Sequence, residues 1–322
     1  MTAQSKFKRL VAGDFSSFGS ALTRPECVWT EDDGVWTSDN AAGGVTKVES
    51  ESCRPLGSGI HEPNGFARRR NGSFVVAGLQ DHKLFEIAVD GTTRVLAEEV
   101  DGRALGVVNC AYVDAQDRVW VSVMTSRRFW HDAINSGPEG YIFVIAGGGA
   151  RIVADGLHLT NEVKLSPDGR YLYAVESLGR RLVRFAVSAD ASLGERETVG
   201  PRDLGHGAFP DGFAFDSEGN VWITLITRNA IAVIDREGGM HTVFEEVNHA
   251  AVNRLVDAIA ARTASPDLMA ACYGPTLKLP TSLAFGGADG RTVYVGSLAG
   301  TALATFRSPV PGLRSSSFRM SP

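Results

Sequence analysis

The sequence predicts an all-β fold, a six-bladed β-propeller, on three observations. A short unit, consisting of a turn followed by a β-rich stretch with an aromatic residue, occurs six times along the chain. The copies that can be followed in full contain four short strand-like segments separated by turns. Glycine is abundant, at 36 of 322 residues, as many tight turns require. Repeats of roughly 40 to 50 residues made of short strands are typical of propeller blades, so we expect one domain over residues 1–322.

The six units follow one another along the chain. They read DGVWTSDN, NGSFVVAG, QDRVWVSV, DGRYLYAV, EGNVWITL and DGRTVYVG, with the aromatic residues Trp36, Phe74, Trp120, Tyr173, Trp222 and Tyr294. In the second unit we expect strands within residues 64–70, 73–79, 83–90 and 92–100. In the third unit we expect them within residues 109–115, 118–124, 141–147 and 150–156. Four antiparallel strands per unit make one blade.

The last unit offers only three strands, within residues 281–287, 291–297 and 302–308. We expect the N-terminal segment 7–13, FKRLVAG, to supply the missing strand and so to close the ring. The fifth and sixth aromatic residues are unusually far apart. Between them, apolar residues recur at helical spacing, which predicts a helix inserted between blades 5 and 6. These residues are Val252, Leu255, Val256 and Ile259.

Composition excludes several classes of partner. The net charge is −5 and no long basic block occurs, which argues against nucleic acid, because phosphate binding needs clustered Lys and Arg. No run of 18 apolar residues occurs, so we expect no membrane span. The first residues lack the apolar segment of a signal peptide, and we expect a cytoplasmic protein. The four cysteines lack paired metal spacing and are expected to be reduced thiols.

A polar residue recurs at the start of the first strand of each predicted blade. These residues are Glu26, Asn64, Asn109, Asn161, Asp211, and either Thr281 or Ser282. First strands line the channel of a propeller, so we expect these side chains to form one ring. Two carboxylates in it would repel each other. A hard divalent cation relieves that repulsion and prefers carboxylate and amide oxygens, whereas a ring without His or Cys argues against a dedicated zinc site.

Three motifs in the chain resemble the SMP-30/gluconolactonase/luciferin-regenerating-enzyme family of six-bladed propellers. They are PECVW, LTNEVKLSPDGRYLYAVES and FPDGFAFDSEGNVWIT. The resemblance implies that Glu26, Asn161 and Asp211 bind one divalent metal and that Asp211 is the base that activates water. It also implies that Asn109 contacts substrate or completes the metal shell. Ca²⁺ is the favoured ion, with Mg²⁺, Mn²⁺ and Zn²⁺ open.

Two positions depart from the family's sugar lactonases. Val107 and Cys110 stand where those enzymes often carry Arg and Asp. The family's arginine holds sugar hydroxyls, so these residues favour a more apolar lactone or ester as the small-molecule substrate. We therefore expect a metal-dependent lactone or ester hydrolase. A phosphotriesterase, a lyase or isomerase on the same site, and a non-catalytic binding propeller remain alternatives, and the oligomeric state is open.

Further residues are candidates for the substrate wall around the ring. Trp130 and His131 lie in a long loop of the third blade, residues 125–140, and His61 precedes Asn64 by three residues. We include Asn64 and Asn109 among the substrate-binding candidates. Cys27 and Cys110 each follow a ring residue, and strict alternation along a strand would point them away from the channel.

Overall fold

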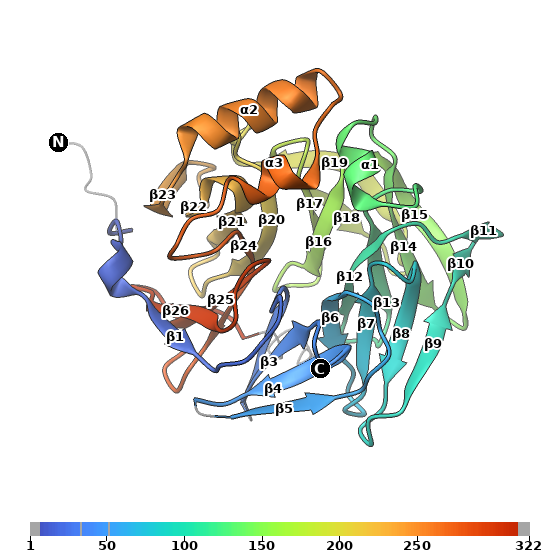
Figure 1. Cartoon of the computed structure of the whole chain (residues 1–322). Helices are drawn as coiled ribbons and strands as arrows, with labels where there is room; N and C mark the ends of the chain where they lie inside the picture. Colours follow the sequence, from blue (N-terminus) through green and yellow to red (C-terminus); the bar gives the residue numbers. More distant parts are fainter. Residues whose placement is uncertain (1–6, 33, 51, 315–322) are drawn as a thin grey trace.

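The computed structural model describes residues 7–32, 34–50 and 52–314 and confirms the six-bladed propeller (Figure 1). Six four-stranded antiparallel sheets surround a central axis, and the innermost strands of neighbouring blades pack against one another. Blade 1 consists of β2 (Val28–Glu31), β3 (Gly34–Asp39), β4 (Gly44–Val48) and β5 (Cys53–Leu56). Blade 2 consists of β6 (Pro63–Arg68), β7 (Phe74–Gly78), β8 (Lys83–Ile87) and β9 (Thr93–Ala97). Blade 3 consists of β12 (Val108–Val113), β13 (Val119–Val123), β14 (Gly140–Ala146) and β15 (Gly149–Leu157). Blade 4 consists of β16 (Thr160–Leu165), β17 (Tyr171–Glu176), β18 (Arg181–Val187) and β19 (Leu193–Val199). Blade 5 consists of β20 (Pro210–Phe215), β21 (Val221–Leu225), β22 (Ala230–Ile234) and β23 (Met240–Glu245). Blade 6 consists of β24 (Pro280–Gly286), β25 (Thr292–Ser297) and β26 (Leu303–Arg307), and β1 (Ser16–Phe18) completes it.

The repeated turn and aromatic unit has a structural explanation in blades 3 and 5. Trp120 and Trp222 are fully buried in the second strands of their blades. The indole N–H of Trp120 donates to Asp114 Oδ2 at 2.9 Å, and that of Trp222 donates to Asp216 Oδ2 at 3.1 Å. Each aspartate also accepts backbone N–H groups of its own turn. One side chain therefore fixes the turn and satisfies the buried indole, as buried polar groups require.

An N-terminal strand closes the ring, as expected, but the strand is not the predicted segment. β1 pairs with β26 antiparallel, with Ser17 opposite Ala304. The predicted segment 7–13 instead runs along blade 5, where Leu10 N donates to Val243 O at 2.8 Å. Phe7 is buried edge-on against Trp222, with ring centroids 5.7 Å apart. Because Phe7 is buried against blade 5, segment 7–13 does not pair with blade 6. Residues 16–18 form the closing strand of blade 6 instead.

The predicted helical insert between blades 5 and 6 is present as α2 (His249–Ala260) and α3 (Pro266–Ala270). The Asn248 side chain caps α2 by accepting the N–H of Ala251 at 3.2 Å. The sequence did not predict α1 (Trp130–Ile134), the short hairpin β10 (Glu99–Val100) and β11 (Arg103–Ala104), or the 3₁₀ turns η1 (Ala12–Asp14) and η2 (Ile226–Arg228). No helix in the described ranges is long and apolar enough to cross a membrane.

Candidate active site at the channel mouth

Bulged inner strands position the polar ring. The pairing of the first and second strands shifts register near the start of five blades, between Pro63 and Phe66 in blade 2 and at the equivalent places in blades 3 to 6. A bulge interrupts the alternation of side chains. Successive residues at the bulge can therefore both face the channel, one layer below the other.

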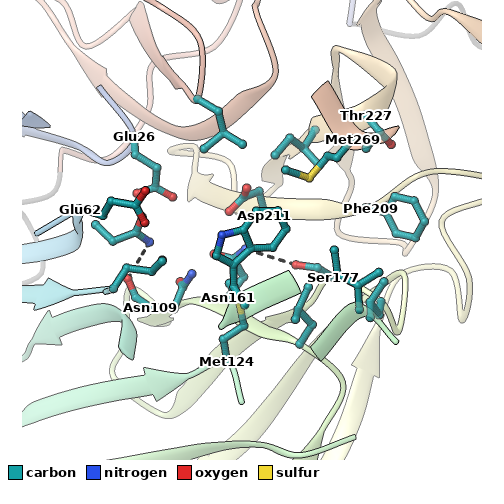
Figure 2. A pocket seen from close by; sticks show the side chains of 18 of the residues that line it. Glu26, Glu62, Asn109, Met124, Asn161, Ser177, Phe209, Asp211, Thr227 and Met269 are labelled. Carbon is teal, nitrogen blue, oxygen red and sulfur yellow. Dashed lines mark hydrogen bonds between the residues drawn. The ribbon is translucent and has the colours of Figure 1, made fainter. Parts of the chain in front are cut away.

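The upper layer brings together the predicted ring residues. The five ring residues of blades 1 to 5 are all buried and line one cavity at the channel mouth: Glu26, Asn64, Asn109, Asn161 and Asp211. Figure 2 shows the Glu26, Asn109, Asn161 and Asp211 side chains converging on this cavity. In blade 6, Thr281 Oγ1 donates to the backbone oxygen of Glu26 at 2.6 Å, and neither Thr281 nor Ser282 lines the cavity at the mouth.

The amide groups of the ring are held by specific hydrogen bonds. Asn161 Nδ2 donates to Ser177 Oγ at 3.3 Å. Asn64 Nδ2 donates to the backbone oxygen of Asn109 at 2.9 Å, and its Oδ1 accepts a bond from Arg24 Nη2 at 2.9 Å. Both ends of the Asn64 amide are thus engaged with the protein, which fits a positioning role.

The negative charge of the two ring carboxylates is only partly offset by nearby positive groups. Burial raises the pKa of Glu26 from 4.5 to about 7; Arg24 opposes the rise, the carboxylate of Glu162 adds to it, and a hydrogen bond with Asn64 again opposes it. Burial also raises the pKa of Asp211 well above its usual value, and repulsion from Glu26 and Glu162 adds to the rise. Taking two negative charges out of water in one place is unfavourable.

The donor set fits a hard divalent cation. No group of three or more His, Cys, Asp or Glu side chains in the described part of the chain is arranged to hold a metal, so a cation here would use amide oxygens beside the two carboxylates. Such oxygen ligands suit Ca²⁺ and Mg²⁺. Glu26, Asn161 and Asp211 are the residues that would hold it, and its charge would relieve the repulsion between the two acids.

Above the polar floor the cavity is mostly apolar. It encloses about 880 Å³, including the volume open to solvent at its mouth. The loop of blade 3 and the insert roof it, through Trp130 and Ile134 of α1, Leu255 and Ile259 of α2, and Met269 of α3. The remaining apolar lining residues are Leu79, Met124, Leu159, Leu178, Phe209, Ile226 and Leu298.

Three predicted wall residues have different positions. Trp130 lines the cavity. His131, on the same helix, does not; its side chain is 38% exposed and stacks on Phe129, with ring centroids 5.2 Å apart. His61 also lies outside the lining: its side chain is 74% exposed and its Nδ1 is 2.7 Å from Asp81 Oδ1. The structure therefore brings only the tryptophan of these three to the cavity.

Below the ring, a second layer corrects the expectation for two cysteines. Cys27 and Cys110 line a small space in the channel under the ring. The bulge between Val108 and Cys110 breaks the alternation in blade 3, whereas Cys27 lies just before β2, outside the paired strand. The other members of this layer are Gly65, Glu162, Gly212 and Ser282. Glu162 is fixed there, 3.0 Å from Lys164 Nζ, with Ser282 Oγ donating to it at 3.0 Å. Both thiols are buried and free, with pKa values raised mainly by burial.

Sequence reasoning missed two charged residues at the cavity. Arg24 and Glu62 line it from neighbouring blades. Each lies two residues before a ring residue, in RPE and EPN, and the same spacing recurs in FPD and LPT. This repeated X-Pro-polar pattern is the sequence signal from which Arg24 and Glu62 could have been identified as cavity residues. In three of the four triplets the first residue lines the cavity, as Arg24, Glu62 or Phe209, whereas Leu279 does not.

Comparisons with known proteins agree with this architecture. Residues 25–250 match the family model described as the SMP-30/gluconolactonase/LRE-like region. The chain is 25% identical over 275 residues to a 6-deoxy-6-sulfogluconolactonase of Pseudomonas putida, covering 84% of this chain and 82% of the relative. A solved putative gluconolactonase superposes with a TM-score of 0.68 at 18% identity, covering 97% of this chain and 98% of the other. A calcium-binding regucalcin from Agrobacterium tumefaciens superposes with a TM-score of 0.62 at 16% identity, covering 93% and 96%.

Proposed function

The chain belongs to the SMP-30/gluconolactonase/LRE-like family, and on that premise we propose that it is a divalent-metal-dependent hydrolase that opens a lactone ring. The observation that carries the proposal is the pair of buried carboxylates, Glu26 and Asp211, at the polar floor of a largely apolar cavity. A cavity of this kind, with a few convergent polar groups and perturbed acids, is the usual form of a small-molecule site.

The cation is part of the proposal. Glu26, Asn161 and Asp211 would hold it, and Ca²⁺ is the first candidate because the regucalcin neighbour is described as calcium-binding. When bound, such an ion supplies Lewis acidity and lowers the pKa of water. Asn109 faces the same floor and is assigned to substrate contact.

Asp211 is proposed as the base. Burial raises the pKa of its carboxyl, and a carboxylate with a raised pKa is a stronger base. It would accept a proton from water while the water oxygen bonds to the lactone carbonyl carbon. The ring C–O bond then breaks, and the proton passes from Asp211 to the departing ring oxygen. The product is a hydroxy acid, and no covalent bond to the enzyme forms.

The lining favours a lactone with an apolar substituent. Gluconolactones carry several hydroxyl groups, whereas twelve of the 21 residues that line this cavity are apolar. Val107, expected from the sequence to weaken sugar binding, is buried and contributes no donor. The three roof helices would cover the carbon skeleton and leave the ring carbonyl beside Glu26 and Asp211.

The decisive experiment is turnover of a lactone and ester panel by chelator-stripped protein with single divalent cations restored. Asp211→Asn should abolish turnover and leave the fold intact, as judged by circular dichroism. Asp257→Asn is the matched control, because Asp257 is exposed on roof helix α2. Cation binding without turnover of any lactone or ester would contradict the hydrolase and favour the lyase, isomerase or binding alternatives. Turnover that survives in Asp211→Asn would exclude this residue as the base.

A further inference from the structure

Arg24 is a cationic group at the floor of the cavity that the proposed reaction does not use. It is the only arginine among the described residues that line the cavity. Its Nη2 donates to Asn64 Oδ1 at 2.9 Å, and Asn64 in turn donates to the backbone oxygen of Asn109 at 2.9 Å. The Asn64 amide of blade 2 therefore fixes the Arg24 guanidinium, and the Asn109 backbone of blade 3 fixes that amide.

One end of this guanidinium lacks a partner. Nη1 is buried and makes no hydrogen bond within the described ranges. No ion pair within 4.0 Å joins Arg24 to a carboxylate in that part of the chain, although Arg24 influences both Glu26 and Asp211 electrostatically. A buried donor without an acceptor is unfavourable. Asn64 thus holds the Arg24 guanidinium near Glu26 and Asp211 without contact to their carboxylates. The Nη1 group can therefore donate a hydrogen bond to an acceptor in the cavity.

The backbone at Arg24 is also unusual. Arg24 has φ +52° and precedes Pro25, although the left-handed conformation is costly for residues other than glycine. Such conformations persist where the surroundings impose them, and they cluster at ligand sites. Here Pro25 O accepts the N–H of Ser297 at 2.8 Å, which anchors the segment to blade 6. In the next blade, Glu62 has φ +51° before Pro63 and also lines the cavity.

We propose that Arg24 is a substrate-binding residue whose guanidinium binds a carbonyl or carboxylate oxygen of the substrate; this deepens, and rests on, the lactone hydrolase proposed above. A guanidinium carries donors only, so its partner must be an acceptor. A lactone offers its carbonyl oxygen, and the ring-opened product offers a carboxylate, with which charge-assisted bonds are strongest. Arg24 and the apolar roof would then orient the substrate between a charged end and an apolar end.

The test compares three molecules with one carbon skeleton: γ-decalactone, 4-hydroxydecanoate and decane-1,4-diol. Binding of the acid and the diol is measured by titration calorimetry on cation-loaded protein, and KM and kcat are measured for the lactone. The variants are Arg24→Met, Arg24→Lys and the control Arg127→Met, since Arg127 is on the blade 3 loop, pairs with Glu139 and does not line the cavity. Melting curves confirm that each variant is folded.

Arg24→Met should weaken binding of the acid about 10- to 100-fold, the range for a hydrogen bond to a charged group, and leave diol binding unchanged. KM for the lactone should rise more than kcat falls, Arg24→Lys should lie between, and Arg127→Met should match the wild type. Equal acid and diol affinities in the wild type, or an acid affinity unchanged in Arg24→Met, would overturn the assignment. Turnover of no lactone by the wild type would count against the hydrolase, while an Arg24-dependent preference for the acid would still support the binding role.

Discussion

Replacing Glu26 by glutamine should stabilise the metal-free protein at alkaline pH while removing a proposed cation ligand. Burial raises the pKa of this carboxyl from 4.5 to about 7. Well below pH 4.5 it is protonated in the folded and the unfolded chain, and the burial penalty is absent. The penalty grows as the pH rises from 4.5 to about 7. Over this range the unfolded chain loses the Glu26 proton freely, whereas the folded chain must either keep that proton or bury a charge. Above pH 7 the penalty is complete.

The size of the effect follows from the shift. A change from 4.5 to about 7 corresponds to about 3 kcal/mol, at about 1.4 kcal/mol per pKa unit. With about 2.1 cal/mol/K of unfolding entropy per residue, 322 residues give about 0.7 kcal/mol/K, so the melting temperature should rise about 4 to 5 °C at pH 8. At pH 5 the folded wild type is already protonated at Glu26, and the expected gain is about 1 kcal/mol or less.

The assay is scanning calorimetry in excess chelator at pH 5 and pH 8. Glu237→Gln is the control, because Glu237 is exposed in a turn, and it should change neither melting temperature. In saturating cation the order should reverse, since the wild type gains binding free energy that Glu26→Gln loses. An equal shift at both pH values, or a lower melting temperature for Glu26→Gln at pH 8 without metal, would refute the electrostatic reasoning.

Three other predictions concern the layers around the ring. Gly65→Ala places a Cβ 2.6 Å from Cys110 Cα and should cost at least about 1 to 3 kcal/mol by urea denaturation, whereas Gly137→Ala, with open space around it, should be neutral; equal stabilities would contradict the close packing. Asn135→Ala removes two 3.0 Å hydrogen bonds to the Ala264 backbone, so amide hydrogen exchange should become faster in the roof helices and not in the blades. Unchanged exchange in the roof helices would show that these two bonds do not hold the roof in place. Cys27 and Cys110 should resist thiol reagents in the folded protein because burial raises their pKa values; labelling of either thiol as fast as in urea would refute their enclosure.

Much of the fold could be predicted from the sequence because each blade repeats the same local chemistry. The aromatic residue of the second strand and the turn before it are local features, so repetition alone identified all six units. The register of the polar ring was equally visible, since Asn161 and Asp211 occupy matching places in their repeats. The helical insert could be predicted because its apolar residues, including Leu255, follow a helical period.

The failures come from features that a strand pattern does not contain. Alternation predicts outward-facing cysteines, but the bulge between Val108 and Cys110 turns consecutive residues to the channel. The closing strand was misplaced because Phe7 is buried against another blade, which no periodicity in its own segment reveals. Arg24 was overlooked because its position depends on a left-handed backbone before a proline, a conformation set by contacts with blade 6.

The sharing of the last sheet between both chain ends has a consequence for biosynthesis. Of the described strands, β1 emerges first from the ribosome and its partner β26 emerges last. Until then the nascent chain carries two unpaired strand edges, at β1 and at β25, of the kind that recruit foreign strands. A ribosome that stalls or terminates before Leu303 would release an unclosed wheel, and this product is expected to be the most aggregation-prone form of the protein.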